Sequence, residues 1–179
     1  GTGRRAAHAG ADAAWLARDA HVFRLPGIYG PGRSALGRVR AGAARRIDLP
    51  GQVFSRIHVD DIVGAVIAAL DAPPGAYNIA DDRPASQNAV IEEACRLLRL
   101  PVPPLQSLDA AGLSAAARGF YAENRRVASG KARRLLGWTP RFADYRAGLA
   151  DCYRAFARIA TTSPAITSTA PAIASADQR

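Results

Sequence analysis

Residues 22–33, which read V-F-R-L-P-G-I-Y-G-P-G-R, constrain the fold of this chain most. The segment begins as a short apolar run, which is typical of a buried parallel strand. Proline fixes φ and removes a donor, and glycine permits positive φ, so the strand predicted at 22–25 must end in a tight loop. Loops at the carboxyl ends of strands in α/β sheets build ligand sites, although this composition also suits an ordinary turn.

Helical and extended patterns alternate along the rest of the chain, which predicts an α/β fold. Strands are expected at 22–25 and 76–80, and the extended segments 45–48 and 52–57 fit either a hairpin or two small strands. Helices are expected at 3–18, 35–40, 62–70, 88–98, 115–121, 131–136 and 145–159. The tail at 161–179 is rich in Thr, Ser, Ala and Pro, which predicts disorder.

Polar residues precede several of these helices and are the expected N-caps. They are Ser34, Asp60 with Asp61, Ser86 and Ser129.

The net charge of +9 comes from 24 Lys and Arg against 15 Asp and Glu, with Lys131 the only lysine. The arginines are scattered without a long run, so the charge does not predict a nucleic-acid partner. No apolar run approaches the ~18 residues of a membrane span. The spacing of Cys95 and Cys152 is not that of metal ligands. We therefore expect both to be buried thiols of a protein in a reducing, cytoplasmic compartment.

Five segments then carry a family resemblance: P-G-I-Y-G-P-G-R, S-R-I-H-V-D-D-I, Y-N-I-A-D-D, E-N-R-R-V and L-L-G-W-T-P-R-F. In this order and spacing, over about residues 3–150, they resemble the C-terminal part of an extended short-chain dehydrogenase/reductase of the NAD-dependent epimerase/dehydratase family. The resemblance implies a truncated Rossmann-like, doubly wound domain over 1–160 with a small C-terminal substrate lobe at about 81–150. It also implies NAD or NADP as cofactor, oxidoreductase or isomerase chemistry, and the option of a homodimer.

The resemblance assigns the cofactor contact to Pro26, Gly27 and Ile28, whose backbone would face the nicotinamide and its ribose. A tight loop with small side chains suits this role, because it lets the backbone approach a flat ring closely.

The resemblance assigns a small-molecule substrate, such as a sugar nucleotide or a similar anion, to Arg33, Arg56 and Asn78. An arginine fork suits phosphate or carboxylate. An ion pair between Arg56 and Asp60 is an equal alternative, and Asn78 could equally satisfy a loop. His58 is expected to be architectural rather than a general base.

The sequence departs from the family pattern in two places. The G-x-x-G-x-x-G loop that would hold the cofactor pyrophosphate is missing. Arg4 and His8 stand where the catalytic Tyr-x-x-x-Lys pair is expected, so no catalytic residue is assigned.

These departures, and the absence of methionine, favour an incomplete or inactive form of such an enzyme, a fragment of a longer product. The alternative is a non-catalytic Rossmann-like module that binds a nucleotide or regulates a partner. In either case a half sheet is expected to expose an apolar strand edge.

Overall fold

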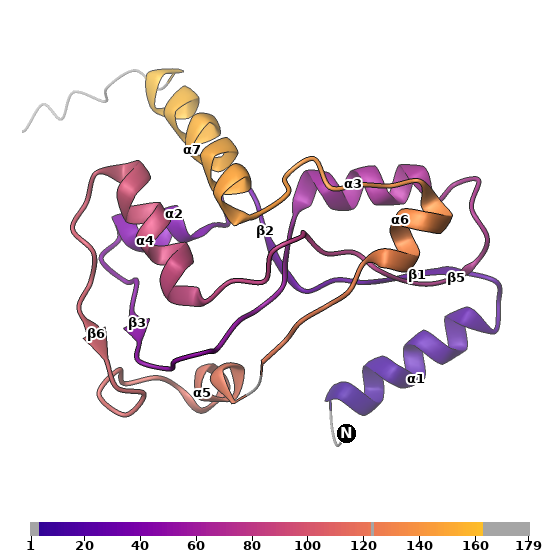
Figure 1. The fold of residues 1–179 in the computed structure, drawn as a ribbon, viewed down its shortest axis with the longest axis horizontal. Coiled ribbons are helices and arrows are strands. Elements are labelled where there is room, and N and C mark those ends of the chain that lie inside the picture. Colours follow the sequence, from indigo (N-terminus) through magenta and orange to yellow (C-terminus); the bar gives the residue numbers. More distant parts are fainter. Residues whose placement is uncertain (1–3, 123, 163–179) are drawn as a thin grey trace, which may run out of the picture.

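A computed structural model describes residues 4–122 and 124–162, in which helices and strands alternate (Figure 1). The α/β fold class is therefore confirmed. The predicted tail at 161–179 lies outside the described residues from position 163 onward, and the last helix extends through position 162. The helices are α1 Arg4–Leu16, α2 Ala35–Arg40, α3 Val59–Ala68, α4 Gln87–Leu98, α5 Ala115–Tyr121, α6 Gly130–Leu136 and α7 Tyr145–Thr162. The strands are β1 His21–Arg24, β2 Gly27–Tyr29, β3 Arg46–Ile47, β4 Arg56–His58, β5 Gly75–Asn78 and β6 Leu105–Gln106.

The described strands form three parallel pairs, β1–β5, β2–β4 and β3–β6. Each pair joins segments far apart in the sequence, as parallel pairing requires a long crossover. The hairpin considered for residues 45–57 is therefore wrong, and the alternative of two small strands is confirmed. The predicted loop at 26–32 also contains a strand, β2, whose Ile28 lies opposite Ile57 of β4.

Two apolar clusters hold these pairs in place. One joins α2, α4 and α7 and buries Val90, Ile91 and Leu149. The other joins β4, α3, β5 and α6 around Tyr77 and Trp138. Both cysteines are free and buried, as predicted, and burial raises the pKa of the Cys152 thiol to about 11.

The predicted N-caps are only partly confirmed. Ser86 Oγ accepts a hydrogen bond from the backbone N–H of Ala89. Ser34 and Ser129 stand before α2 and α6, but neither side chain makes a capping hydrogen bond. The Ser34 hydroxyl lies beside the Cys152 thiol instead, and Ser129 Oγ accepts from Arg133.

The cap of α3 was assigned wrongly, because β4 continues to residue 58 and the helix starts directly after it. His58 is the N-cap, and its Nδ1 accepts from the backbone N–H of Asp60 at 3.2 Å. Asp60 and Asp61 occupy the first turn of the helix, where their charge complements the helix dipole.

The buried carboxylate of Asp61 ties α3 to the loop that precedes α7. It accepts from the backbone N–H groups of Arg141 at 2.6 Å and Phe142 at 3.2 Å. The backbone carbonyl of Asp61 also accepts from the Trp138 indole at 3.1 Å. One residue therefore fixes the C-terminal loop against α3.

We expect Asp61→Ala to lower the free energy of unfolding by about 2 kcal/mol, because two buried backbone N–H groups lose their acceptor. Urea denaturation followed by circular dichroism measures this. The matched control is Asp60→Ala, since the side chain of Asp60 is half exposed and makes no such bonds in the described chain. Equal losses in the two variants would contradict the role assigned to Asp61.

Candidate functional site

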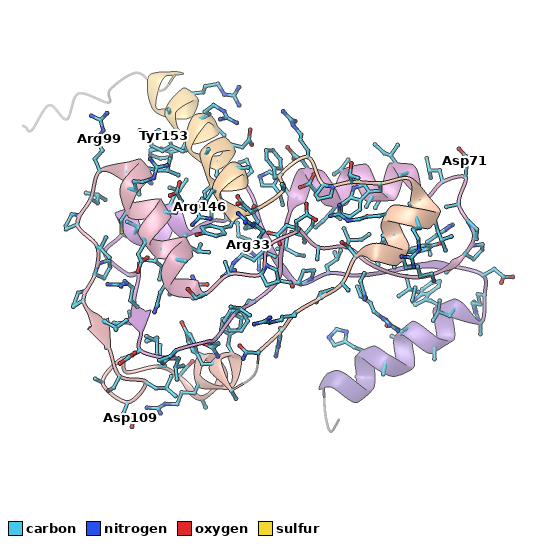
Figure 2. The ribbon with its side chains drawn as sticks, in the orientation of Figure 1. Arg33, Asp71, Arg99, Asp109, Arg146 and Tyr153 are labelled. Carbon is cyan, nitrogen blue, oxygen red and sulfur yellow. The ribbon has the colours of Figure 1, made fainter. Side chains whose placement is uncertain are left out.

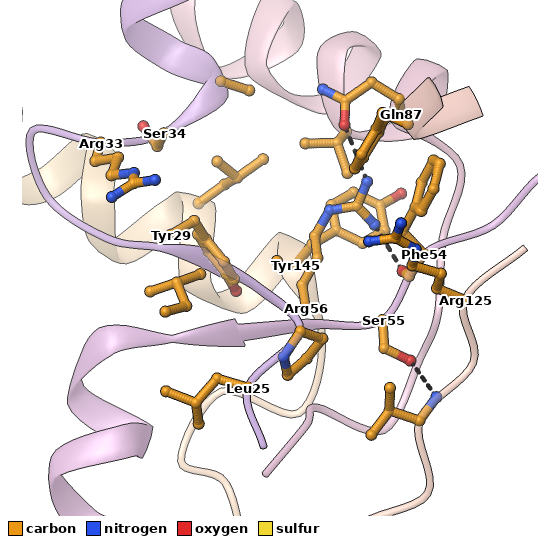
Figure 3. A pocket seen from close by; sticks show the side chains of 18 of the residues that line it. Leu25, Tyr29, Arg33, Ser34, Phe54, Ser55, Arg56, Gln87, Arg125 and Tyr145 are labelled. Carbon is orange, nitrogen blue, oxygen red and sulfur yellow. Dashed lines mark hydrogen bonds between the residues drawn. The ribbon is translucent and has the colours of Figure 1, made fainter. Parts of the chain in front are cut away.

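A cavity of about 980 Å³ opens where β1, β2 and β4 meet α2, α4 and α7 (Figure 3). All of the sequence-predicted cofactor and substrate residues line it: Pro26, Gly27, Ile28, Arg33, Arg56 and Asn78. These residues come from separate parts of the chain. The fold therefore brings both predicted groups to one cavity.

The loop segment at 26–28 forms one wall of this cavity. The backbone N–H of Gly27 donates to the Ser55 carbonyl at 3.3 Å, which joins the segment to β4. Ile28 remains 41% exposed, so its side chain offers apolar surface at the cavity. Gly30 follows β2 and packs closely against Val59, since a Cβ there would lie only 2.6 Å from Cγ1 of Val59.

Arg56 crosses the floor of the cavity toward Gln87 (Figure 3). Its guanidinium donates to the carbonyls of Phe54 at 3.0 Å and Ala85 at 2.7 Å, and to Oε1 of Gln87 at 3.2 Å. The alternative ion pair with Asp60 is not formed in the described structure. Burial lowers the pKa of Arg56, and the nearby Asp81 charge opposes this shift.

The cavity wall is strongly basic. Among the described residues that line it there is no Asp or Glu, whereas the arginines are Arg24, Arg33, Arg38, Arg56, Arg125 and Arg126. Arg24 is paired with Asp12, but Arg33 and Arg38 are exposed and form no ion pair with a described residue. Figure 2 shows Arg33 near the middle of the molecule, far from the peripheral Arg99. An anion would find uncompensated positive charge here.

An aromatic wall completes the cavity on the side of Arg125. Phe54 is buried and stacks on Phe120, with ring centroids 4.0 Å apart and an interplanar angle of 20°. Tyr121 meets both rings edge-on. Phe120 is 37% exposed and can offer its outer face to a planar ligand group.

Asn78 ends β5 at the cavity, where its amide donates to the Ala128 carbonyl at 3.4 Å. This bond ties β5 to the 124–128 segment, and the same segment is held by Ser55, whose Oγ accepts from the backbone N–H of Val127 at 2.8 Å. Asn78 therefore has a structural contact and also lines the cavity.

Two buried polar groups lie close to the cavity floor, and the sequence patterns did not single them out. The hydroxyl of Tyr29 and both carboxylate oxygens of Asp81 have no hydrogen-bond partner in the described structure. Burial raises the pKa of Asp81 to about 7, although the nearby Arg56 charge opposes this shift. Burial and the Asp81 charge also raise the pKa of Tyr29, so its hydroxyl stays protonated.

The histidines do not line this cavity. His58 is fully buried under the edge of Tyr29, with its Nε2 3.8 Å from the Cys152 sulfur. His8 is exposed on α1, and the side chain of Arg4 lies outside the described part of the structure. Within residues 4–122 and 124–162, no group of His, Cys, Asp and Glu could hold a metal ion, and no helix is long and apolar enough to span a membrane.

The chain matches no protein-family model. It is 34% identical over 143 residues to a 3-diazoavenalumate denitrifying reductase of a Streptomyces species. The matched region covers 72% of this chain and 45% of that protein. A functionally unknown conserved protein from Silicibacter pomeroyi DSS has a similar solved structure, with a TM-score of 0.73 and 44% identity. That match covers 80% of this chain and 52% of the other. The chain thus spans about half the length of these relatives.

The chain also resembles part of the fold of more distant solved structures. The structure of the dTDP-glucose 4,6-dehydratase DesIV from Streptomyces venezuelae, solved with NAD bound, gives a TM-score of 0.66 at 18% identity, covering 85% of this chain and 50% of that one. Other structures of this fold contain NAD or NADPH. The chain is therefore structurally similar, over most of its length, to NAD-dependent epimerase/dehydratase enzymes, and it matches part of their Rossmann-like fold.

Proposed function

We propose that this chain forms the substrate side of an NAD(P)-dependent oxidoreductase of the epimerase, dehydratase or reductase type. The observation that carries the proposal is that the 26–28 loop shares one cavity with a wall whose described lining residues include six arginines and no Asp or Glu. The Streptomyces relative, whose name describes a reductase, supports the same class of chemistry. The relatives that suggest this activity are about twice as long as the segment they share with this chain.

The described residues fit only one end of the cofactor. The open surface of Ile28, beside the backbone of Pro26 and Gly27, suits the face of a nicotinamide ring. When bound, NAD or NADP would accept or supply a hydride there. Arg33 and Arg38 would bind and orient an anionic substrate, such as a sugar nucleotide. The stacked rings of Phe54 and Phe120 would lie against the planar part of that substrate.

The alternative is a non-catalytic module that binds a nucleotide. Missing from the sequence are the glycine loop and the Tyr-x-x-x-Lys pair, and no Asp, Glu, His or Lys lines the described cavity. This alternative predicts that nucleotide binds without hydride transfer. The proposed enzymatic function predicts hydride transfer when the remainder of the Rossmann-like fold is present.

We expect the double variant Arg33→Ala, Arg38→Ala to bind uridine diphosphate at least about 10-fold more weakly than the unmodified chain, because each arginine can make charge-assisted hydrogen bonds to phosphate. Titration calorimetry of uridine diphosphate and NADH, with circular dichroism as a folding check, measures this. The control is Arg99→Asn, which removes a distant positive charge at a left-handed residue that Asn tolerates. An unchanged affinity in the double variant, or an equal loss in the control, would count against the proposed substrate wall.

A further inference from the structure

The side chains that line the candidate cavity offer many hydrogen-bond donors and few free acceptors. Arginine carries donors only, and six of the described lining residues are arginines. The guanidinium of Arg56 already uses Oε1 of Gln87 as an acceptor, at 3.2 Å. What remains of the Gln87 amide is again a donor.

Backbone carbonyls of the cavity wall are engaged within the protein as well. The Phe54 carbonyl accepts from the Arg56 guanidinium and from the backbone N–H of Ala85. Other carbonyls of lining residues that accept a hydrogen bond from the chain itself belong to Arg24, Ser55, Arg56, Arg125 and Ala128. A ligand that enters this cavity therefore meets an excess of donors.

This excess discriminates between classes of anionic ligand. Every hydroxyl group of a sugar brings a donor that needs an acceptor, and a donor that is buried without one weakens binding. A carboxylate or phosphate group brings acceptors and matches the fork of arginine. Arg33 and Arg38 are exposed at the cavity and form no ion pair with a described residue, so they can bind such a group.

The aromatic wall indicates the shape of the rest of the ligand. Phe120 stacks on Phe54, and Tyr121 meets Phe120 edge-on at a centroid distance of 5.5 Å. These contacts hold the Phe120 ring in one orientation while 37% of the residue stays exposed. An aromatic face that is both braced and open favours a flat ring stacked on it.

We propose that the substrate bound by this wall is a flat aromatic anion, which is an aromatic ring with a carboxylate or phosphate group and few hydroxyl groups. The ring lies on the outer face of Phe120, and the acid group pairs with Arg33 or Arg38. The inference rests on the proposed function, because it concerns the same cavity. It narrows the anionic substrates of that function to those that bring acceptors and few donors.

The first test compares three phosphate esters by titration calorimetry on the purified chain: naphthyl phosphate, its fully saturated decahydro analogue and glucose 1-phosphate. All three carry the same anion, so they differ only in the group attached to it. We expect naphthyl phosphate to bind at least about 10-fold more tightly than glucose 1-phosphate and about 5-fold more tightly than the saturated analogue. Equal affinities for the three esters, tighter binding of the glucose ester, or no binding of naphthyl phosphate would each overturn the proposal. Naphthoate, titrated in parallel, identifies whether the carboxylate or the phosphate is preferred.

The second test uses the variant Phe120→Leu. It should bind naphthyl phosphate about 5-fold more weakly and glucose 1-phosphate unchanged, because only the aromatic ester stacks on the ring. Trp15→Leu is the matched control, since Trp15 is 59% exposed on α1 and does not line the cavity. Circular dichroism checks that both variants are folded. An equal loss for both esters in Phe120→Leu, or an equal loss of naphthyl phosphate in the two variants, would overturn the proposal.

These titrations need no cofactor, so the inference and the proposed function can fail separately. A chain that binds NADH but shows no preference for the aromatic ester would overturn the inference and leave the proposed function standing. A chain that prefers the aromatic ester but does not bind NADH would retain the ligand class and count against the proposed oxidoreductase.

Discussion

Asp81→Asn is expected to raise the free energy of unfolding by about 3 kcal/mol at pH 8 and to leave it nearly unchanged at pH 4. The carboxyl group is buried, and burial raises its pKa from 3.8 to about 7. Between these values the folded state holds a proton that the unfolded state has lost. The free energy of unfolding therefore falls as pH rises from about 4 to about 7. The total loss is at most about 1.4 kcal/mol for each unit by which the folded-state pKa exceeds the unfolded-state pKa.

The groups that act on this carboxyl include Arg56, which favours its ionised form, and Asp144, which opposes it. Asparagine stays neutral, so the pH-dependent loss should disappear. Urea denaturation at pH 4, 6 and 8 measures the profile. Asp82→Asn is the control, because Asp82 is exposed and pairs with Arg133, and its profile should follow the unmodified chain. Parallel profiles for Asp81→Asn and the unmodified chain would refute the assignment.

Gly148→Ala is expected to destabilise the chain by about 3 kcal/mol. A Cβ at this buried position of α7 would lie 2.6 Å from Cζ and 2.7 Å from Cε2 of Tyr29. Tyr29 is itself packed between α7 and His58, so the ring cannot move without disturbing a buried cluster. Overpacking of this kind costs about 1–3 kcal/mol and can cost more. Denaturation by urea provides the measurement.

Gly10→Ala is the matched control for this effect. Gly10 lies in α1 with no atom within 4 Å of its added Cβ, so alanine should stabilise the helix by about 0.5–1 kcal/mol. Combining Gly148→Ala with Tyr29→Ala should cost less than the sum of the two single changes, because the clash disappears with the ring. Strict additivity would show that the two residues do not meet.

The longer elements were predictable because their patterns are strong. Helix α4 combines a serine cap with apolar residues at helical spacing, and the structure confirms both. Strand β1 ends two residues before Pro26, and its bounds lie within one residue of the prediction. Strands β2 and β6 were not predicted, because they have only three and two residues, too few for any period to be visible.

Local rules also competed with tertiary contacts. Asp60 and Asp61 are good N-cap residues, yet His58 takes that position because β4 runs to it. Ser34 satisfies the sequence rule for a cap, but its hydroxyl lies beside a cysteine of α7 that no local pattern reveals.

In the candidate site too, some residues were predictable from the sequence and others only from the folded structure. Residues 26–28, Arg33, Arg56 and Asn78 were predicted because the family resemblance pointed to them, and all of them line the cavity. Arg38 and Phe120 were missed, since only the folded chain brings α2 and α5 to the same cavity. Asp81 was missed for a different reason, because burial and not sequence determines its pKa.

The hydrogen bond from the Val127 backbone to Ser55 Oγ spans 72 positions of the chain. Contacts of such long range are slow to form, because much chain entropy must be lost before they contribute. We therefore expect the wall that contains Arg125 and Phe120 to form late in folding. A nascent chain released at residue 120 would already contain the 26–28 loop, but it would have no closed cavity in which to retain a ligand.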